Sequence, residues 1–189
     1  MTIFDPEPDD TRPLAVLDFE ASCLPAPGAS FPIEVGVAYI DTDEVRSWLI
    51  KPITRWREKG VWDPAAEKLH GITREQLERD GLPVDVVCSE LTATIAGHCV
   101  LSDNVGADDG WLSILFSAVG QEVPCRLEPA LEAARDVLRS SRTELATSDA
   151  DILITDALRH ARERHPVEHR AGPDAARWAE ALRLLGEAT

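Results

Sequence analysis

Two carboxylic acids, Asp18 and Glu20, follow the short apolar run Leu14–Leu17 near the N-terminus. A continuous apolar run predicts a central strand buried on both faces. The acids end this strand two residues apart, so both side chains point to the same side of the sheet. Two carboxylates held there are costly unless a cation lies between them, and Mg²⁺ and Mn²⁺ prefer oxygen ligands. The pair is a candidate metal site, although acids at strand ends are commonly only solvated.

A second acidic cluster lies in the segment from Ser102 to Leu112. It leaves an apolar run, crosses a polar loop and enters a helix with Asp108 and Asp109 in the first turn. Capping and the helix dipole favour acids at a helix start without any metal. Taken alone, this segment is better explained by structure than by catalysis.

The third cluster is His169-Arg170-Ala171-Gly172-Pro173-Asp174, just before an apolar-periodic helix. Asp174 could serve only as an N-cap, and His169 only as a surface histidine. A histidine five residues before an acid also suits a site in which one residue binds a metal and the other transfers a proton. Asp174 would hold a metal, and the imidazole of His169 would take a proton from the attacking water.

Together these segments resemble the DEDDh family of 3′→5′ exonucleases, which includes ribonuclease T, oligoribonuclease and the proofreading subunit of bacterial DNA polymerase III. The family's first motif, D-x-E followed by a hydroxyl residue, resembles residues 18–22. Its second motif, H-N-x-x-F-D-x-x-[FW]-L, resembles residues 103–112, and its third, H-x-x-x-x-D, resembles residues 169–174. Ile33-Glu34-Val35-Gly36 and His70-Gly71-Ile72-Thr73 also resemble family segments. The resemblance covers nearly the whole chain, and three motifs in order are far more specific than any one of them.

The chain departs from the family's pattern at Asp103, where many members have histidine, at Ala107, where they have phenylalanine, and at Ser22, where threonine is usual. The adjacent acids Asp108 and Asp109 also leave the ligand of the second motif ambiguous. The spacing to Asn104 and Trp111 favours Asp108.

The resemblance implies a two-metal-ion 3′→5′ exonuclease that releases nucleoside 5′-monophosphates from the ends of single-stranded RNA or DNA. Two Mg²⁺ or Mn²⁺ ions, roughly 3.5–4 Å apart as is usual for two-metal sites, would be held by Asp18, Glu20, Asp108 and Asp174. His169 would be the general base. Family members are often homodimers, so a homodimer is a further expectation.

Two alternatives remain open. The departures in the second motif and the acidic charge are compatible with a weak or inactive binding module that keeps the exonuclease fold. A chain without a broad basic surface would also suit a phosphodiesterase of dinucleotides or other very short oligonucleotides. The choice between RNA and DNA depends on contacts to the 2′-hydroxyl.

Three strands must position the first motif. Leu14–Leu17 is followed by Ile33–Ile40 and Val45–Ile50, both rich in β-branched residues, and the acidic link 41–43 predicts a hairpin turn between them. The three strands form an expected meander, and Cys99–Leu101 is a fourth strand. Residues 23–32, with three prolines, form a loop.

Helical periodicity follows these strands. Thr73, with Gln76 three residues later, predicts a helix start, and Gly97 predicts a helix stop. Helices are expected at Val84–Ala96, Trp111–Val119, Pro129–Leu138, Asp149–Arg164 and Asp174–Leu185. The order predicts a single α/β domain over residues 14–189. With the family resemblance, the expected fold is ribonuclease H-like: a mixed five-stranded sheet flanked by helices. Residues 1–13 are interpreted as a flexible acidic leader.

Composition agrees with a globular chain: 44% of the 189 residues are hydrophobic and 28% are charged. No apolar run is long enough to cross a bilayer, and the N-terminus does not resemble a secretory signal. The four cysteines stand far apart, which predicts free thiols and favours a cytoplasmic location. The net charge of −15 argues against a protein that coats long duplex nucleic acid.

Other residues carry weaker signals. The basic cluster in residues 159–170 is either a solvated helix face or a phosphate-contacting surface. Phe19 is expected in the core, and Trp56, Trp62 and Trp111 are expected to be packing residues. His70 is given no catalytic role.

Overall fold

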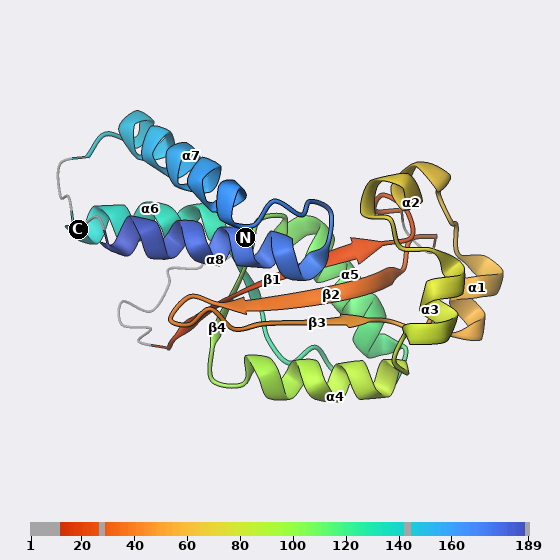
Figure 1. The fold of residues 1–189 in the computed structure, drawn as a ribbon. Helices are drawn as coiled ribbons and strands as arrows, with labels where there is room; N and C mark the ends of the chain where they lie inside the picture. The colour runs from red at the N-terminus through yellow and green to blue at the C-terminus, as the bar shows by residue number, and fades with distance from the viewer. Residues whose placement is uncertain (1–11, 27–28, 142–144, 188–189) are drawn as a thin grey trace.

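The computed structural model describes residues 12–26, 29–141 and 145–187, in which five strands form one mixed sheet (Figure 1). The strands are β1 (Leu14–Ala21), β2 (Pro32–Tyr39), β3 (Val45–Leu49), β4 (Cys99–Ser102) and β5 (Leu127–Pro129), in the spatial order β3-β2-β1-β4-β5. β2 pairs antiparallel with both β1 and β3, whereas β4 pairs parallel with β1 and β5. The expected ribonuclease H-like sheet with its N-terminal meander is confirmed.

The first strand is longer than its apolar run. β1 continues through Asp18 and Glu20 to Ala21, so the two acids lie inside the strand rather than at its end. The reason is the ladder with β2, in which Asp18 stands opposite Gly36 and Glu20 opposite Glu34. The register of this ladder shifts between Glu20 and Ala21. Backbone pairing therefore decides where the strand ends, and it holds both acids on a rigid element.

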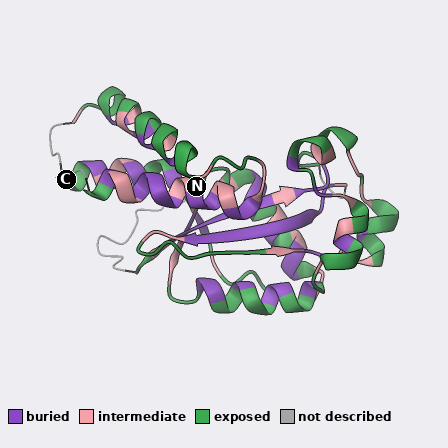
Figure 2. Ribbon diagram, in the orientation of Figure 1, coloured by how far each residue is buried: buried purple, intermediate pink, exposed green. Residues whose placement is uncertain are grey.

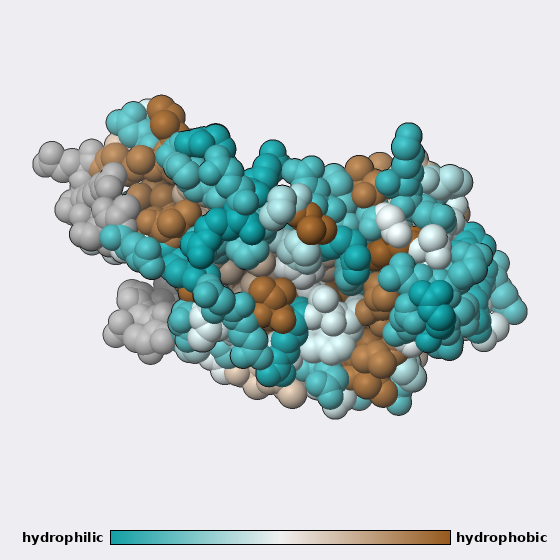
Figure 3. Space-filling model, in the orientation of Figure 1, coloured by the Kyte–Doolittle hydropathy of each residue, from teal (hydrophilic) through white to brown (hydrophobic). Residues whose placement is uncertain are grey.

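Helices cover both faces of the sheet (Figure 1). One face carries α4 (Val84–Ile95) and α5 (Val105–Ser117), and the other carries α6 (Ala130–Ser141) and α8 (Ala171–Glu187), with α7 (Thr147–Arg164) packed on these two helices. Figure 2 shows β2 buried along almost its whole length and the edge strand β3 largely exposed. Figure 3 shows hydrophilic residues over most of the same view, with hydrophobic residues in small separate patches.

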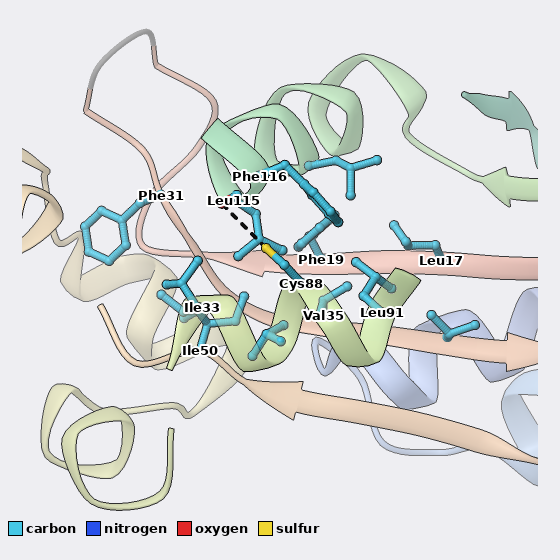
Figure 4. Packing of buried hydrophobic residues seen from close by; sticks show 14 of the residues in the cluster. Leu17, Phe19, Phe31, Ile33, Val35, Ile50, Cys88, Leu91, Leu115 and Phe116 are labelled. Carbon is cyan, nitrogen blue, oxygen red and sulfur yellow. Dashed lines mark hydrogen bonds between the residues drawn. The ribbon is translucent and has the colours of Figure 1, made fainter. Parts of the chain in front are cut away.

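The two faces of the sheet carry different cores. Larger side chains fill the α4–α5 side, where the Cys88 thiol lies among Leu91, Leu115 and Phe116 (Figure 4). The other side is rich in alanines from α6, α7 and α8. Small side chains allow helices to approach the sheet closely, so α8 lies directly on β1 and β2.

Strand alternation assigns the acids of β1 to one of these sides. Val16 packs under α8, and because alternate side chains share a face, Asp18 and Glu20 also lie on that side. Phe19 points into the opposite core and is only 4% exposed. The prediction that Phe19 is a core residue is confirmed.

The segment between β3 and α4 folds as three short helices, α1 (Thr54–Lys59), α2 (Pro64–His70) and α3 (Arg74–Asp80). The Thr73 hydroxyl accepts a hydrogen bond from the backbone N–H of Gln76 at 3.1 Å, so the expected helix start is confirmed. Gly97 follows α4 with a positive φ of 78°, as a helix stop requires. The aromatic Trp56 is buried and stacks on Phe31 with ring centroids 5.8 Å apart.

Cys23 and Cys88 are buried and Cys99 and Cys125 are partly buried, as expected. Among the described residues, no helix is long and apolar enough to cross a membrane. The division into a leader and a single domain stays a prediction, because residues 1–11 lie outside the described part of the chain.

Candidate active site

Three aspartates from β1, from the loop after the neighbouring parallel strand β4 and from α5 meet where α5 begins. Asp18 of β1, Asp103 of the loop after β4, and Asp108 in the first turn of α5 have carboxylate oxygens within 4.8 Å of one another. Asp108 is 1% exposed, and the Ser102 hydroxyl donates a hydrogen bond to its Oδ2 at 2.5 Å. Asp109 is exposed to solvent. Of the two adjacent acids of the second motif, Asp108 is therefore the one that lies beside Asp18.

A second group of potential ligands lies at the start of α8. Glu20, His169 and Asp174 have ligand atoms within 4.8 Å of one another. Asp174 stands in the first turn of α8, and its Oδ2 accepts a hydrogen bond from the Arg170 N–H at 3.3 Å. Its Oδ1 lies 2.7 Å from Arg177 Nη1 but is buried without a hydrogen bond from any described residue.

The electrostatics of the two groups favour a bound cation. Burial raises the pKa of Asp18 well above its usual value, and Asp108 and Asp103 raise it further. Burial, followed by the charge of Asp174, raises the pKa of Glu20 to about 8. Burial also raises the pKa of Asp108 to about 7, against the opposing hydrogen bond from Ser102, and raises that of Asp174. Partly buried acids that repel one another in this way are stabilised by a multivalent cation.

The donor set fits Mg²⁺ or Mn²⁺. All four acids proposed from the motifs offer oxygen atoms, which these hard ions prefer. β1, α5 and α8 each hold one or two of them on regular secondary structure.

Two neighbours of the site did not follow from the motifs as functional residues. Asp103, noted only as a departure from the family pattern, adds a carboxylate and accepts a hydrogen bond from Trp178 Nε1 at 3.0 Å. Glu34 of β2 is buried opposite Glu20 and forms an ion pair with Arg170. A signal for Glu34 was present in the sequence, because a charged residue interrupts an otherwise apolar strand.

The aromatic residues and His70 pack as expected. Trp111 is partly buried and donates its indole N–H to the Ser30 hydroxyl at 2.9 Å, and Trp62 donates to Glu67 at 2.5 Å. His70 is buried, and its Nδ1 accepts a hydrogen bond from the Ile72 N–H at 3.0 Å, which ties the end of α2 to the next turn.

The basic cluster of residues 159–170 is largely balanced by acids. The ion pairs are Arg159 with Asp156 and Glu163, Arg162 with Glu168, Arg164 with Glu180, and Arg170 with Glu34. This pairing favours the solvated-face interpretation over a surface that contacts phosphates.

The mixed sheet with helices on both faces has the architecture of the ribonuclease H-like fold. Residues 15–182 match the sequence profile described as RNase T exonuclease. The match covers most of the chain, so the chain belongs to this exonuclease family. The resemblance to DEDDh exonucleases drawn from the three motifs is thereby confirmed.

Solved structures with the same fold include Escherichia coli exonuclease I in a zinc-bound complex with single-stranded DNA (16% identity, TM-score 0.64, covering 94% of this chain and 41% of that chain). Another is the nuclease domain of 3′hExo, a DEDDh family member bound to rAMP (16% identity, TM-score 0.60, 95% and 94% covered). A full-length 3′-exonuclease is similar at 15% identity and a TM-score of 0.60, with 93% and 82% covered. At these identities the likeness concerns the fold, and this chain spans about two fifths of the exonuclease I chain. No curated protein matches the sequence.

Proposed function

We propose that this chain is a metal-dependent 3′→5′ exonuclease that releases nucleoside 5′-monophosphates from single-stranded nucleic acid. The observation that carries the proposal is the meeting of four acids from β1, α5 and α8 with one histidine from the loop before α8. Asp18 and Asp108 lie in one group, and Glu20, Asp174 and His169 lie in the other.

Each residue has a role in the proposed reaction. Asp18, Glu20, Asp108 and Asp174 would hold two Mg²⁺ or Mn²⁺ ions. When bound, these ions lower the pKa of the attacking water and offset the charge on the phosphoryl group. A nitrogen of the His169 ring would accept the water's proton while the water oxygen bonds to phosphorus and the bond to the 3′-oxygen breaks. The freed 3′-oxygen takes a proton from solvent.

The direct test uses single-stranded oligonucleotides labelled at the 5′ end, in matched RNA and DNA forms. With Mn²⁺ or Mg²⁺ the protein should shorten them stepwise, and EDTA should stop the reaction. A 3′-blocked oligonucleotide should resist digestion if the polarity is as proposed. If the wild type and Asp18→Ala digest equally slowly, the activity comes from a contaminant and the proposal fails.

Calorimetric titration with Mn²⁺ separates an enzyme from an inactive module. The proposed site should bind two ions, whereas a chain that keeps only the fold should bind Mn²⁺ weakly or at one site.

Very short oligonucleotides are a second candidate substrate, favoured by the charges around the site. Arg170 and Arg177 next to the carboxylates are already paired with Glu34 and Asp174. The exposed Asp103 and Asp109 add negative charge at the same place. A long strand with many phosphates therefore gains little attraction here. If this candidate holds, a length series from dinucleotides to 20-mers should show kcat/KM highest for the shortest members.

A further inference from the structure

The loop that carries His169 is held at both of its ends. This loop, residues 165–170, joins α7 to α8 and is called the histidine loop below. At its first half, Arg177 of α8 donates its Nε to the His165 carbonyl at 2.9 Å and its Nη2 to the Val167 carbonyl. The Arg177 side chain is only 12% exposed, and its bond to the His165 carbonyl is partly buried, whereas its bond to the Val167 carbonyl lies at the surface.

At the second half, a buried carboxylate of the sheet holds the loop. Arg170 donates Nε to Glu34 Oε2 at 2.9 Å and Nη2 to Oε1 at 2.6 Å. The Ala171 N–H donates to the same Oε2 at 3.0 Å. The Glu34 side chain is 2% exposed, and the two parallel bonds fix both the distance and the plane of the guanidinium. Glu34 thereby sets the position of the residue that follows His169.

The backbone of His169 needs such support. Its φ is 55°, in the left-handed region that non-glycine residues adopt at a cost. A conformation of this kind persists only where the surrounding structure fixes it. In the structure this conformation places a ring nitrogen of His169 within 4.8 Å of carboxylate oxygens of Glu20 and Asp174.

The start of α8 is docked on β2 by a separate contact. A Cβ atom at Gly36 would lie 2.3 Å from the backbone of Ala171 and Gly172, so strand and helix touch directly there. This backbone contact at Gly36 is separate from the bonds that Glu34 makes to Arg170 and Ala171.

We propose that the Glu34–Arg170 ion pair positions His169 for proton transfer. Glu34 is the partner of Glu20 across the β1–β2 ladder, so the pair ties the base to the strand beside β1, which presents Asp18 and Glu20. The proposal rests on the exonuclease function proposed above. Glu34 and Arg170 are positioning residues, and their effect on the reaction passes through the imidazole.

The test is a double-mutant cycle with Glu34→Gln and His169→Ala. The amide keeps the shape of the carboxylate but cannot accept both bonds from Arg170. In the wild-type background, Glu34→Gln should lower kcat by roughly 10- to 100-fold with KM little changed, as expected when a reacting group is displaced. In the His169→Ala background the same change should alter kcat by less than about 2-fold, because the group it positions is gone. Equal losses in both backgrounds would overturn the proposal.

The matched control is Glu180→Gln. Glu180 is also about 1% exposed and lies on α8, but it pairs with Arg164 and Arg183. Its replacement should leave kcat unchanged. If Glu34→Gln does not fold, Arg170→Lys supplies the second variant. Lysine keeps the positive charge but cannot make the bidentate hydrogen bonds to Glu34.

A readout independent of activity separates this proposal from the exonuclease function. The NMR order parameter of the His169 amide should fall in Glu34→Gln and stay unchanged in Glu180→Gln. If the wild type has no nuclease activity but this mobility increases, the function fails and the anchoring of the loop stands. If the wild type is active while a folded Glu34→Gln shows neither higher mobility nor lower kcat, the positioning role is wrong.

Discussion

Asp108 and Asp109 are neighbours in the sequence with different surroundings. Asp108 is 1% exposed beside Asp18 and Ser102, whereas Asp109 faces solvent on α5. If Asp108 is a metal ligand, Asp108→Asn should lower Mn²⁺ affinity and reduce kcat at least 100-fold, since asparagine keeps the shape but not the charge. Asp109→Asn should leave both within about 2-fold, as expected for an exposed substitution. Calorimetry and the nuclease assay measure the two quantities, and equal losses in both variants would contradict the assignment.

The acids of the site should make the metal-free protein less stable as the pH rises. Burial raises the folded-state pKa of Glu20 to about 8 and that of Asp108 to about 7. Unfolded carboxyls titrate near pH 4, so above about pH 4 the folded state binds these protons more tightly. Their contribution to stability is therefore present at low pH and is lost as the pH rises through about 5 to 8.

Urea unfolding in EDTA across this range should show the decline, and Glu20→Gln should reduce it. Added Mn²⁺ should offset the decline in the wild type, because bound metal replaces the missing protons. A wild-type stability that stays flat or rises between about pH 5 and pH 8 would contradict the raised pKa values.

The candidate residues of the site were predictable as far as their motifs reached. The first and third motifs contain Asp18, Glu20, His169 and Asp174 at fixed spacings, and the structure brings Glu20, His169 and Asp174 together in one group of potential ligands. The same motifs could not give the hydrogen bonds of Asp103 and Glu34. Those depend on which strands and helices meet, since Glu34 and Arg170 are 136 residues apart.

The contact between β2 and α8 sets the geometry of the site at the level of elements. Gly36 lets the start of α8 lie against the strand, and any Cβ there would meet the backbone of Ala171 at 2.3 Å. Gly36→Ala should therefore push α8 outward, lower the free energy of unfolding by at least about 1–3 kcal/mol and displace Asp174 and His169. Activity should fall further than the loss of folded protein accounts for.

Gly110→Ala is the control for that substitution. Gly110 lies within α5, and a Cβ there meets nothing within 4 Å, so alanine should stabilise the helix by about 0.5–1 kcal/mol. Denaturant unfolding of both variants checks the pair. A destabilised Gly110→Ala with a stable Gly36→Ala would contradict the role given to the close contact.

Periodicity identified the long elements better than their boundaries. The sequence predicts a helix start at Trp111, because Gly106 and Gly110 weaken the helical signal before it. In the structure α5 begins at Val105, and tertiary contacts stabilise the additional residues. α8 begins at Ala171, where the bond from its N–H to Glu34 takes the place of a local cap. The three short helices α1, α2 and α3 carry too few turns for an apolar period to be recognised.

The charge of the whole molecule bears on how it would bind nucleic acid. The chain has a formal charge of −15, and arginines near the site are paired with acids. Binding of a single strand should therefore release few counterions. The affinity of His169→Ala protein for a labelled 20-mer should change with salt by a log–log slope smaller in magnitude than about 2, since each phosphate neutralised on a single strand contributes about 0.7. Fluorescence anisotropy measures this slope, and a steep dependence would reveal a basic binding track.

The left-handed backbone of His169 separates what folding prefers from what the proposed chemistry needs. At a φ of 55° the backbone of a glycine would be unstrained, whereas that of an alanine would be strained. His169→Gly should thus be more stable than His169→Ala by about 1 kcal/mol, the reverse of their order in a helix. Thermal unfolding of the two variants checks this order. Directed evolution of the chain for thermal tolerance alone would tend to discard the histidine, so any such selection must include an activity screen.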